Sequence, residues 1–316
     1  MQDCAKAFMN IGQTIAHYRI TGRPAAGGAD GVYRAEDLRV HRTVALRILT
    51  GGAGSRAGLQ ERQLADARTA SALDHPNISS LHEICETDEA LVLVLPWYDG
   101  ESLRAKIVRG PLRVEAAISI ARQLAEGLAS AHAAGILHGS LHPGSLHITA
   151  DGIVKIMDFG VAEHFRDSAG TVFPAGPAYL APEQLRGREV DARTDVWAFG
   201  VILFEMLTGR LPFGGHTSAM VHHAILKEEP ADPAAFRTDL PGSLVSLCRN
   251  CLSKKPSGRP QSMDDVMSLL GHWPFDLAAI TASDPSRLRG RHIALMVVIL
   301  VFIAGGLVFI LRGCQT

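Results

Sequence analysis

The chain has 316 residues and a mass of 33.8 kDa, which allows one large domain or two modest ones. Hydrophobic residues make up 47% of it and charged residues 20%, a composition that predicts a folded chain and excludes extensive disorder. A formal net charge of -1 gives no indication of a nucleic-acid or other polyanionic partner, so no nucleic-acid partner is predicted. The cysteines are odd in number and scattered, which favours a reducing compartment over a disulfide framework. They are Cys4, Cys85, Cys248, Cys251 and Cys314.

The first third of the chain is rich in predicted strands. Residues 1–17 form an N-terminal extension without the basic-then-apolar pattern of a signal peptide. Residues 18–97 combine short β-type runs with one helical stretch, and together they predict a small β-rich lobe. The β-type runs lie at 32–35, 43–49 and 90–95, and the helical stretch at 59–73.

The next part, residues 98–275, is predicted to be mainly helical. Apolar residues within 114–134 recur at helical spacing and form one stripe. Residues 196–207 are apolar on nearly every side and predict a helix buried at the centre of this lobe. Asp151-Gly152, between two short β-type runs, predicts a tight hairpin. The fold class is therefore α+β, with one two-lobed domain at 18–275.

The C-terminal part carries the pattern of a membrane anchor. Residues 276–292 are predicted to be a juxtamembrane linker. Residues 293–311 carry no charge, and a helix of that length reaches about 28 Å, close to the roughly 30 Å hydrocarbon core of a bilayer. A buried core helix is the alternative, but core helices are seldom apolar on every face. The sequence thus predicts one transmembrane helix.

The basic residues beside this segment predict its orientation. Arg287, Arg289 and Arg291 precede it, whereas only Arg312 follows it. By the positive-inside rule the large N-terminal part stays in the cytoplasm. We therefore expect a single-pass protein of the cytoplasmic (inner) membrane, with residues 312–316 as an extracytoplasmic tail.

Eight segments in sequence resemble the bacterial serine/threonine protein kinase domain. They are YRITGRPAAGGADGVYRAED, TVALRIL, DHPNI, ILHGSLHPGSLHI, VKIMDFG, AYLAPEQ, RTDVWAFGVILFEMLTGRLPF and GRP. The resemblance extends from about Tyr18 to Gly271. It implies a two-lobed kinase fold, with the N-lobe at about 18–97 and the C-lobe at about 98–275, and it implies ATP and Mg²⁺ as cofactors.

The loop that covers the nucleotide phosphates in this family departs from the usual pattern. Its three spaced glycines correspond to Ala25, Gly27 and Asp30. Gly27 is retained, but Asp30 would place a carboxylate near the phosphates, where like charges repel. The alternative register uses Gly28 and Gly31. In either register the resemblance implies a weakened phosphate loop.

Arg47 stands where the family has its phosphate-pairing lysine. The charge is retained, although a planar guanidinium is not equivalent to a compact ammonium. The helical glutamate that normally pairs with this lysine corresponds to Asp66. The resemblance implies an Arg47–Asp66 ion pair with a structural role.

The adenine site is only partly retained. By resemblance, Val32 and Ala45 form its roof and the amide of Tyr98 faces the edge of the adenine. His147 replaces the apolar residue beneath the base, and a polar imidazole there weakens the apolar sandwich. We expect ATP to bind weakly or not at all.

The catalytic loop differs from the family pattern at three positions. Ser140 replaces the catalytic aspartate, and a hydroxyl has no basic form near neutral pH. His142 replaces the lysine that steadies the transferred phosphoryl group. Ser145 replaces the asparagine that holds one Mg²⁺, and a neutral hydroxyl is a poor ligand for a hard cation. No catalytic residue of this loop is intact.

Other motif positions match the family. Asp158 corresponds to an aspartate that holds Mg²⁺, so it could still bind one metal ion. Five further positions correspond to structural residues: the spine residues His138 and Phe159, the ion pair Glu183–Arg259, and the loop anchor Asp195.

Three functions are consistent with this pattern. The first is a membrane-tethered pseudokinase that binds partner proteins, active kinases among them. The second is a slow serine/threonine kinase in which Asp158, Arg47 and His142 act by positioning alone. The third is a nucleotide sensor that transfers nothing.

Overall fold

The computed structural model describes residues 10–22, 32–50, 71, 73–86, 90–159, 177–271 and 280–281. The chain divides into two units, residues 1–280 and 281–316, and nearly all described residues belong to the first. In the described part of the chain, no helix is long and apolar enough to cross a membrane. The segment 293–311, predicted to span the membrane, lies outside the described residues, as does most of the helix predicted at 59–73.

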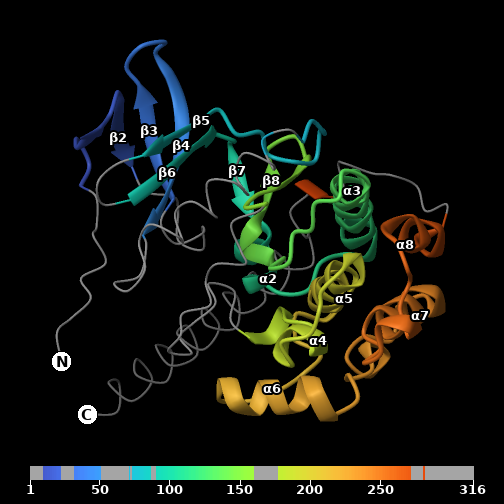
Figure 1. The fold of residues 1–316 in the computed structure, drawn as a ribbon. Coiled ribbons are helices and arrows are strands. Elements are labelled where there is room, and N and C mark those ends of the chain that lie inside the picture. The colour runs from blue at the N-terminus through green and yellow to red at the C-terminus, as the bar shows by residue number, and fades with distance from the viewer. Residues whose placement is uncertain are drawn as a thin grey trace, which may run out of the picture. The chain divides into compact units, whose positions relative to one another are not determined.

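The N-lobe contains a six-stranded antiparallel sheet with the strand order β1-β2-β3-β4-β6-β5 (Figure 1). Side chains alternate between buried and exposed along β2 and β3, as expected for strands with one face on a core. Tyr18, Ile20, Val44 and Leu46 lie in this core, and each fully buried large apolar side chain contributes about 1.5–3 kcal/mol. The strands are β1 (Thr14–Ile15), β2 (Tyr18–Gly22), β3 (Val32–Asp37), β4 (Arg42–Thr50), β5 (Glu83–Glu86) and β6 (Ala90–Pro96).

The C-lobe is mainly helical, as the sequence predicts, and includes a small sheet of order β7-β8-β9. The strands are β7 (Gly100–Ser102), β8 (Leu146–Thr149) and β9 (Val154–Ile156). The α-helices are α2 (Leu103–Val108), α3 (Val114–Ala133), α4 (Pro182–Leu185), α5 (Ala192–Thr208), α6 (Ser218–Lys227), α7 (Gly242–Cys251) and α8 (Met263–Leu270). Short 3₁₀ turns lie at η1 (Pro143–Ser145), η3 (Pro177–Tyr179), η4 (Pro233–Ala235) and η5 (Pro256–Gly258).

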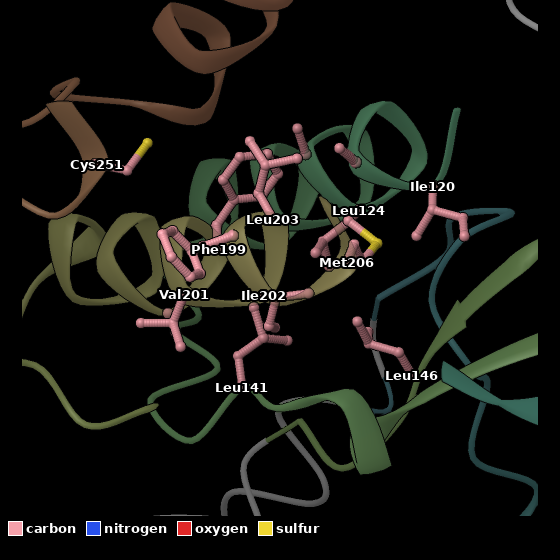
Figure 2. Packing of buried hydrophobic residues seen from close by; sticks show 14 of the residues in the cluster. Ile120, Leu124, Leu141, Leu146, Phe199, Val201, Ile202, Leu203, Met206 and Cys251 are labelled. Atoms are coloured by element: carbon pink, nitrogen blue, oxygen red, sulfur yellow. The ribbon is translucent and has the colours of Figure 1, made fainter. Parts of the chain in front are cut away.

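Helix α5 is the centre of the C-lobe, and it contacts α3 and α7 (Figure 1). Its apolar side chains are buried around the whole helix, which confirms the interpretation of residues 196–207. Figure 2 shows Phe199, Ile202 and Leu203 of this helix packed among side chains from neighbouring elements, including Leu124 of α3. The helix begins at its cap Asp191, whose carboxylate accepts from the backbone of Arg193. Asp195 of this helix accepts from the backbone amides of His138 and Gly139, so the helix supports the loop that precedes β8.

The strands β8 and β9 form the predicted hairpin around Asp151-Gly152. Its register places Leu146 opposite Ile156. The catalytic loop, residues 138–145, therefore precedes β8 at the same end of the hairpin at which Asp158 follows β9. The backbone of Met157 donates to the Ser145 carbonyl at 2.8 Å, which joins these two segments.

Candidate functional site

A cleft with a cavity volume of about 220 Å³ lies between residues of the N-lobe sheet and the β7-β8-β9 sheet. Its lining includes six positions that the sequence assigns to nucleotide or metal binding: Val32, Ala45, Arg47, Tyr98, His147 and Asp158. The seventh, Gly27, lies outside the described residues. The remaining lining residues are Leu95, Pro96, Trp97, Asp99, Gly100, Glu101, Ser102, Ala105, Gly144 and Met157.

The register of the sheet brings the apolar roof of the cleft together. Val32 of β3 is paired with Arg47 of β4, and Ala45 of β4 is paired with Leu95 of β6. Since side chains alternate along a strand, Ala45 and Arg47 lie on the same face of β4. The same face of this strand therefore carries both an apolar and a cationic residue into the cleft.

Arg47 forms a buried ion pair with Asp158. Its Nη1 lies 3.0 Å from the Asp158 Oδ2, and the two side chains are 7% and 6% exposed. The expected partner Asp66 lies outside the described residues, so the Arg47–Asp66 pair stays a prediction. Asp158 has a φ of 68°, in the left-handed region that few non-glycine residues adopt. The charge of Arg47 is thus directed at the carboxylate that the sequence assigns to metal binding.

His147 lines the cleft near the hinge that joins the two lobes, residues 95–98. Its ring centroid is 6.3 Å from that of Tyr98. Burial lowers the pKa of His147, and the backbone of Tyr98 offsets part of this effect. Its Nε2 is buried without a hydrogen-bond partner among the described residues.

The Ser145 hydroxyl is occupied within the catalytic loop itself. Its Oγ donates to the carbonyl of His142 at 2.8 Å and accepts from the amide of His142 at 3.2 Å. Ser145 is fully buried, and it closes a capping box at the start of η1. This hydroxyl therefore stabilises the conformation of the loop.

His142 is a neutral side chain in this structure. Burial lowers its pKa to about 3, and the neighbouring His138, Arg47 and Arg104 add to the effect. Its Nδ1 accepts a hydrogen bond from the amide of Gly144 at 3.0 Å, which an uncharged ring nitrogen can do. A neutral imidazole cannot supply the charge of the lysine it replaces.

Asp195 anchors the start of the catalytic loop. One of its carboxylate oxygens accepts from the amide of His138 at 2.9 Å and the other from the amide of Gly139 at 2.8 Å. His132 Nε2 contacts the same carboxylate at 2.8 Å. Burial by itself would raise the pKa of Asp195, but these partners outweigh it and the pKa is lowered. The loop backbone is thus held although its reactive side chains are changed.

His138 links this loop to the segment that carries Asp158. Its Nε2 lies 3.0 Å from the carbonyl of Met157, and its ring centroid is 4.9 Å from that of Phe159. Its Nδ1 lies 3.4 Å from the amide of Ser140. An Nε2–H tautomer satisfies both contacts.

Glu183 and Arg259 form a bidentate ion pair that braces the C-lobe. Arg259 Nη1 and Nη2 donate to the two Glu183 oxygens at 2.7 and 2.9 Å. Thr194 donates to the same carboxylate at 3.1 Å, and the Arg259 guanidinium lies 5.0 Å from the Trp197 ring. Both charged side chains are buried, so removing either one would leave the charge of the other buried without compensation.

Comparison with known proteins assigns the chain to a family. A family profile described as "Protein kinase domain" matches residues 25–272. The chain belongs to the protein kinase family. Its similarity to bacterial serine/threonine kinases agrees with the resemblance carried by the eight sequence segments, and the family in general uses ATP and Mg²⁺.

Several curated bacterial kinases are similar to the chain. Serine/threonine-protein kinase pkn2 of Myxococcus xanthus is 34% identical over 275 residues, which cover 84% of this chain and 33% of that protein. PknB of Mycobacterium tuberculosis is 33% identical, covering 76% and 40%. PrkC of Bacillus subtilis is 32% identical, covering 82% and 41%. The chain thus spans about a third to two-fifths of the length of these relatives.

Solved structures support the fold. The kinase domain of Mycobacterium tuberculosis PknI matches with a TM-score of 0.68 at 24% identity, and the match covers 83% of this chain and 98% of that domain. This confirms the two-lobed kinase fold that the sequence predicts.

The described residues do not fit a site for two Mg²⁺ ions. Asp158 is one suitable carboxylate, but it already forms an ion pair with Arg47. The hydroxyl of Ser145 is hydrogen-bonded to the backbone of His142. Mg²⁺ demands octahedral oxygen ligands and is usually bound by one or two carboxylates together with phosphates. In the described part of the chain, no three His, Cys, Asp or Glu side chains are grouped so that they could hold a metal ion. Asp158 alone remains a predicted metal ligand.

Sequence reasoning missed the polar rim of the cleft. Glu101 lines the cleft, and Arg109 and Lys106 pair with it. Asp99 lies beside it and accepts from the indole of Trp97 at 3.1 Å. Their position in the sequence could have indicated this role. Asp99 and Glu101 directly follow residues 95–98, and the chain passes along the cleft as it enters β7.

Proposed function

We propose that the chain is a membrane-anchored pseudokinase that acts by binding partner proteins, active kinases among them. The observation that supports it most strongly is the state of the catalytic loop. Residues 138–145 contain no carboxylate, His142 is neutral, and Ser145 is bound to the loop backbone. A general base contributes about 100- to 10,000-fold to the rate, and this loop offers none.

The retained parts of the fold support a binding role. Asp195 holds the loop, and the Glu183–Arg259 pair braces the C-lobe beneath it. Phosphoryl transfer depends on positioning and charge, so a rigid scaffold without the reacting groups keeps its surface for partners while losing the reaction. The chain would thus keep the architecture of a kinase without its chemistry.

The second candidate is a slow serine/threonine kinase. The names of the similar proteins and the intact Asp158 favour it. In this case Arg47 and Asp158 would position the phosphates without a base in the catalytic loop.

Phosphate incorporation from labelled Mg-ATP separates the two candidates. The full chain in detergent micelles, incubated with a generic basic protein substrate, is expected to show no transfer above that of Asp158→Ala. Transfer that is clearly present in the wild type and lost in Asp158→Ala would establish the kinase and overturn the pseudokinase.

Membrane anchoring through residues 293–311 is part of the proposal. It rests on the length and apolar character of that segment and on the arginines that precede it. Protease treatment of intact cells should leave the kinase-like domain undigested, since the proposed location is the cytoplasmic face of the inner membrane. Digestion of the domain would reverse the proposed orientation.

A further inference from the structure

The hinge carries two adjacent aromatic side chains, Trp97 and Tyr98. β6 of the N-lobe sheet ends at Pro96, and β7 of the C-lobe sheet begins at Gly100, so the two rings lie where the chain passes between the lobes (Figure 1). Both side chains are partly exposed. The face of an aromatic ring attracts a nearby cation. The contacts of these two rings therefore affect how freely the hinge can bend.

Arg34 contacts the hinge from the N-lobe. It is an exposed residue of β3, and its guanidinium carbon is 5.2 Å from the centroid of the Trp97 ring. β3 is paired with β4 along its whole length, which gives Arg34 a fixed base in the N-lobe sheet. The indole of Trp97 also donates to Asp99 at 3.1 Å, and this bond orients the ring. Trp97 is thus held to the N-lobe by a cation over its face.

Lys155 contacts the hinge from the C-lobe. Its Nζ is 5.2 Å from the centroid of the Tyr98 ring, and it donates to the carbonyl of Pro76 at 2.6 Å. Lys155 lies on β9, where it is paired with His147 of β8. The ring of His147 is itself near Tyr98, with 6.3 Å between the centroids. Tyr98 is thus held by the β8-β9 hairpin of the C-lobe.

The backbone directly after the hinge is fixed to the same hairpin. The carbonyl of Asp99 accepts from the amide of Ala150 at 2.9 Å, and Gly100 is paired with Thr149. Gly100 has a φ of 149°, and a Cβ at this position would overlap the carbonyl oxygen of Ile148. Glycine permits this close approach because it has no side chain. Bending of the hinge is therefore confined to residues 95–98.

We propose that Arg34 and Lys155, one from each lobe, form a clasp on the two aromatic rings of the hinge and keep the lobes in one relative orientation. Rotation of the lobes about the hinge would move at least one cation off the face of its ring. A fixed orientation presents one arrangement of the two lobes to a binding partner and keeps the width of the cleft constant. The inference goes beyond the proposed function, because the clasp would act whether or not the chain transfers phosphate.

Distances between two spin labels, one on each lobe, test the clasp in the full chain in detergent micelles. Val40→Cys, in the turn between β3 and β4, and Leu269→Cys on α8 provide exposed labelling positions. Three native cysteines are buried and should not react, and the other two are replaced by serine. The buried ones are Cys85, Cys248 and Cys251, and the replaced ones are Cys4 and Cys314. With the native hinge we expect one narrow distance distribution.

Two matched double variants separate the clasp from a general effect of mutation. Arg34→Gln/Tyr98→Leu removes the cation on one side and the ring on the other, so the distribution should become about twofold wider. Arg34→Lys/Tyr98→Phe keeps a cation and a ring on each side, so the distribution should stay as narrow as with the native hinge. Arg19→Gln, which breaks an exposed pair with Glu36, is a further control and should change nothing.

Three results would overturn the proposal. They are equal widths with the native hinge and in Arg34→Gln/Tyr98→Leu, equal widening in both double variants, and more than one distance with the native hinge. The thermal midpoint of each variant shows whether it is folded. If Arg34→Gln/Tyr98→Leu is not folded, the single variants Arg34→Gln and Lys155→Gln are compared in the same way, and each should widen the distribution.

Discussion

The hydroxyl of Ser145 donates to the carbonyl of His142 at 2.8 Å, so two residues of the catalytic loop are bound to each other. The same hydroxyl accepts from the amide of His142, which leaves it committed to the loop backbone. A side chain that caps a turn in this way stabilises the loop without facing a ligand. The loop is therefore ordered and, at these positions, lacks the groups that transfer chemistry requires.

The pH dependence of stability should reveal the neutral state of His142. Its pKa is lowered to about 3 in the folded chain, whereas an unfolded histidine has a pKa of about 6.5. Below pH 6.5 the unfolded state binds a proton that the folded state does not, so stability falls as pH decreases towards 3. Between pH 6.5 and pH 5 this residue should cost about 2 kcal/mol.

Urea unfolding at pH 7 and pH 5 measures this loss. In His142→Gln, which cannot titrate, the difference between the two pH values should be smaller by about the same 2 kcal/mol. An equal loss in the wild type and the variant would show that His142 is charged or exposed in the folded chain.

Removing Arg47 should destabilise the chain because it leaves Asp158 buried and unpaired. Breaking a buried ion pair costs about 3–5 kcal/mol, so Arg47→Met should lose roughly 3 kcal/mol of unfolding free energy. The double variant Arg47→Met/Asp158→Asn should recover part of it, since asparagine has nearly the volume of aspartate, tolerates the left-handed φ of this position and leaves no buried charge unpaired. Additive losses in the double variant would mean that the two residues do not interact.

The Glu183–Arg259 pair should carry a similar part of the stability of the C-lobe. Glu183→Gln keeps the shape of the side chain but removes the charge that Arg259 faces, and we expect a loss of about 3 kcal/mol. Arg249→Gln, which breaks an exposed pair with Asp232, should change stability little. Thermal or urea unfolding compares the two, and equal effects would argue against a structural brace.

The sequence predicted much of the cleft lining, since the resemblance to kinase motifs assigned Val32, Ala45, Tyr98 and His147 to it. It did not predict the pairing of Arg47 with Asp158. The family resemblance assigned Asp66 as a partner of Arg47, and that pair stays a prediction because Asp66 lies outside the described residues. The observed pair joins β4 to the segment that follows β9, two parts of the chain that are far apart in sequence. Such proximity is a property of packing and leaves no pattern along the chain.

The environment of the catalytic loop was also beyond the sequence. The replacements at Ser140, His142 and Ser145 are readable directly, but the neutral state of His142 arises from its burial. The capping bonds of Ser145 depend on the 3₁₀ turn that Pro143 begins. The sequence thus revealed which residues are replaced, whereas the lowered pKa of His142 and the hydrogen bonds of Ser145 became visible only in the structure.

Restoring the family residues of the catalytic loop tests whether their loss is what prevents phosphoryl transfer. Phosphate incorporation is measured for the full chain and for the triple variant Ser140→Asp/His142→Lys/Ser145→Asn under identical conditions with Mg-ATP. At millimolar Mg-ATP, no transfer is expected from the wild type, and a gain of at least 100-fold over background is expected from the triple variant. Wild-type transfer equal to that of the triple variant, and abolished by Asp158→Ala, would contradict this expectation.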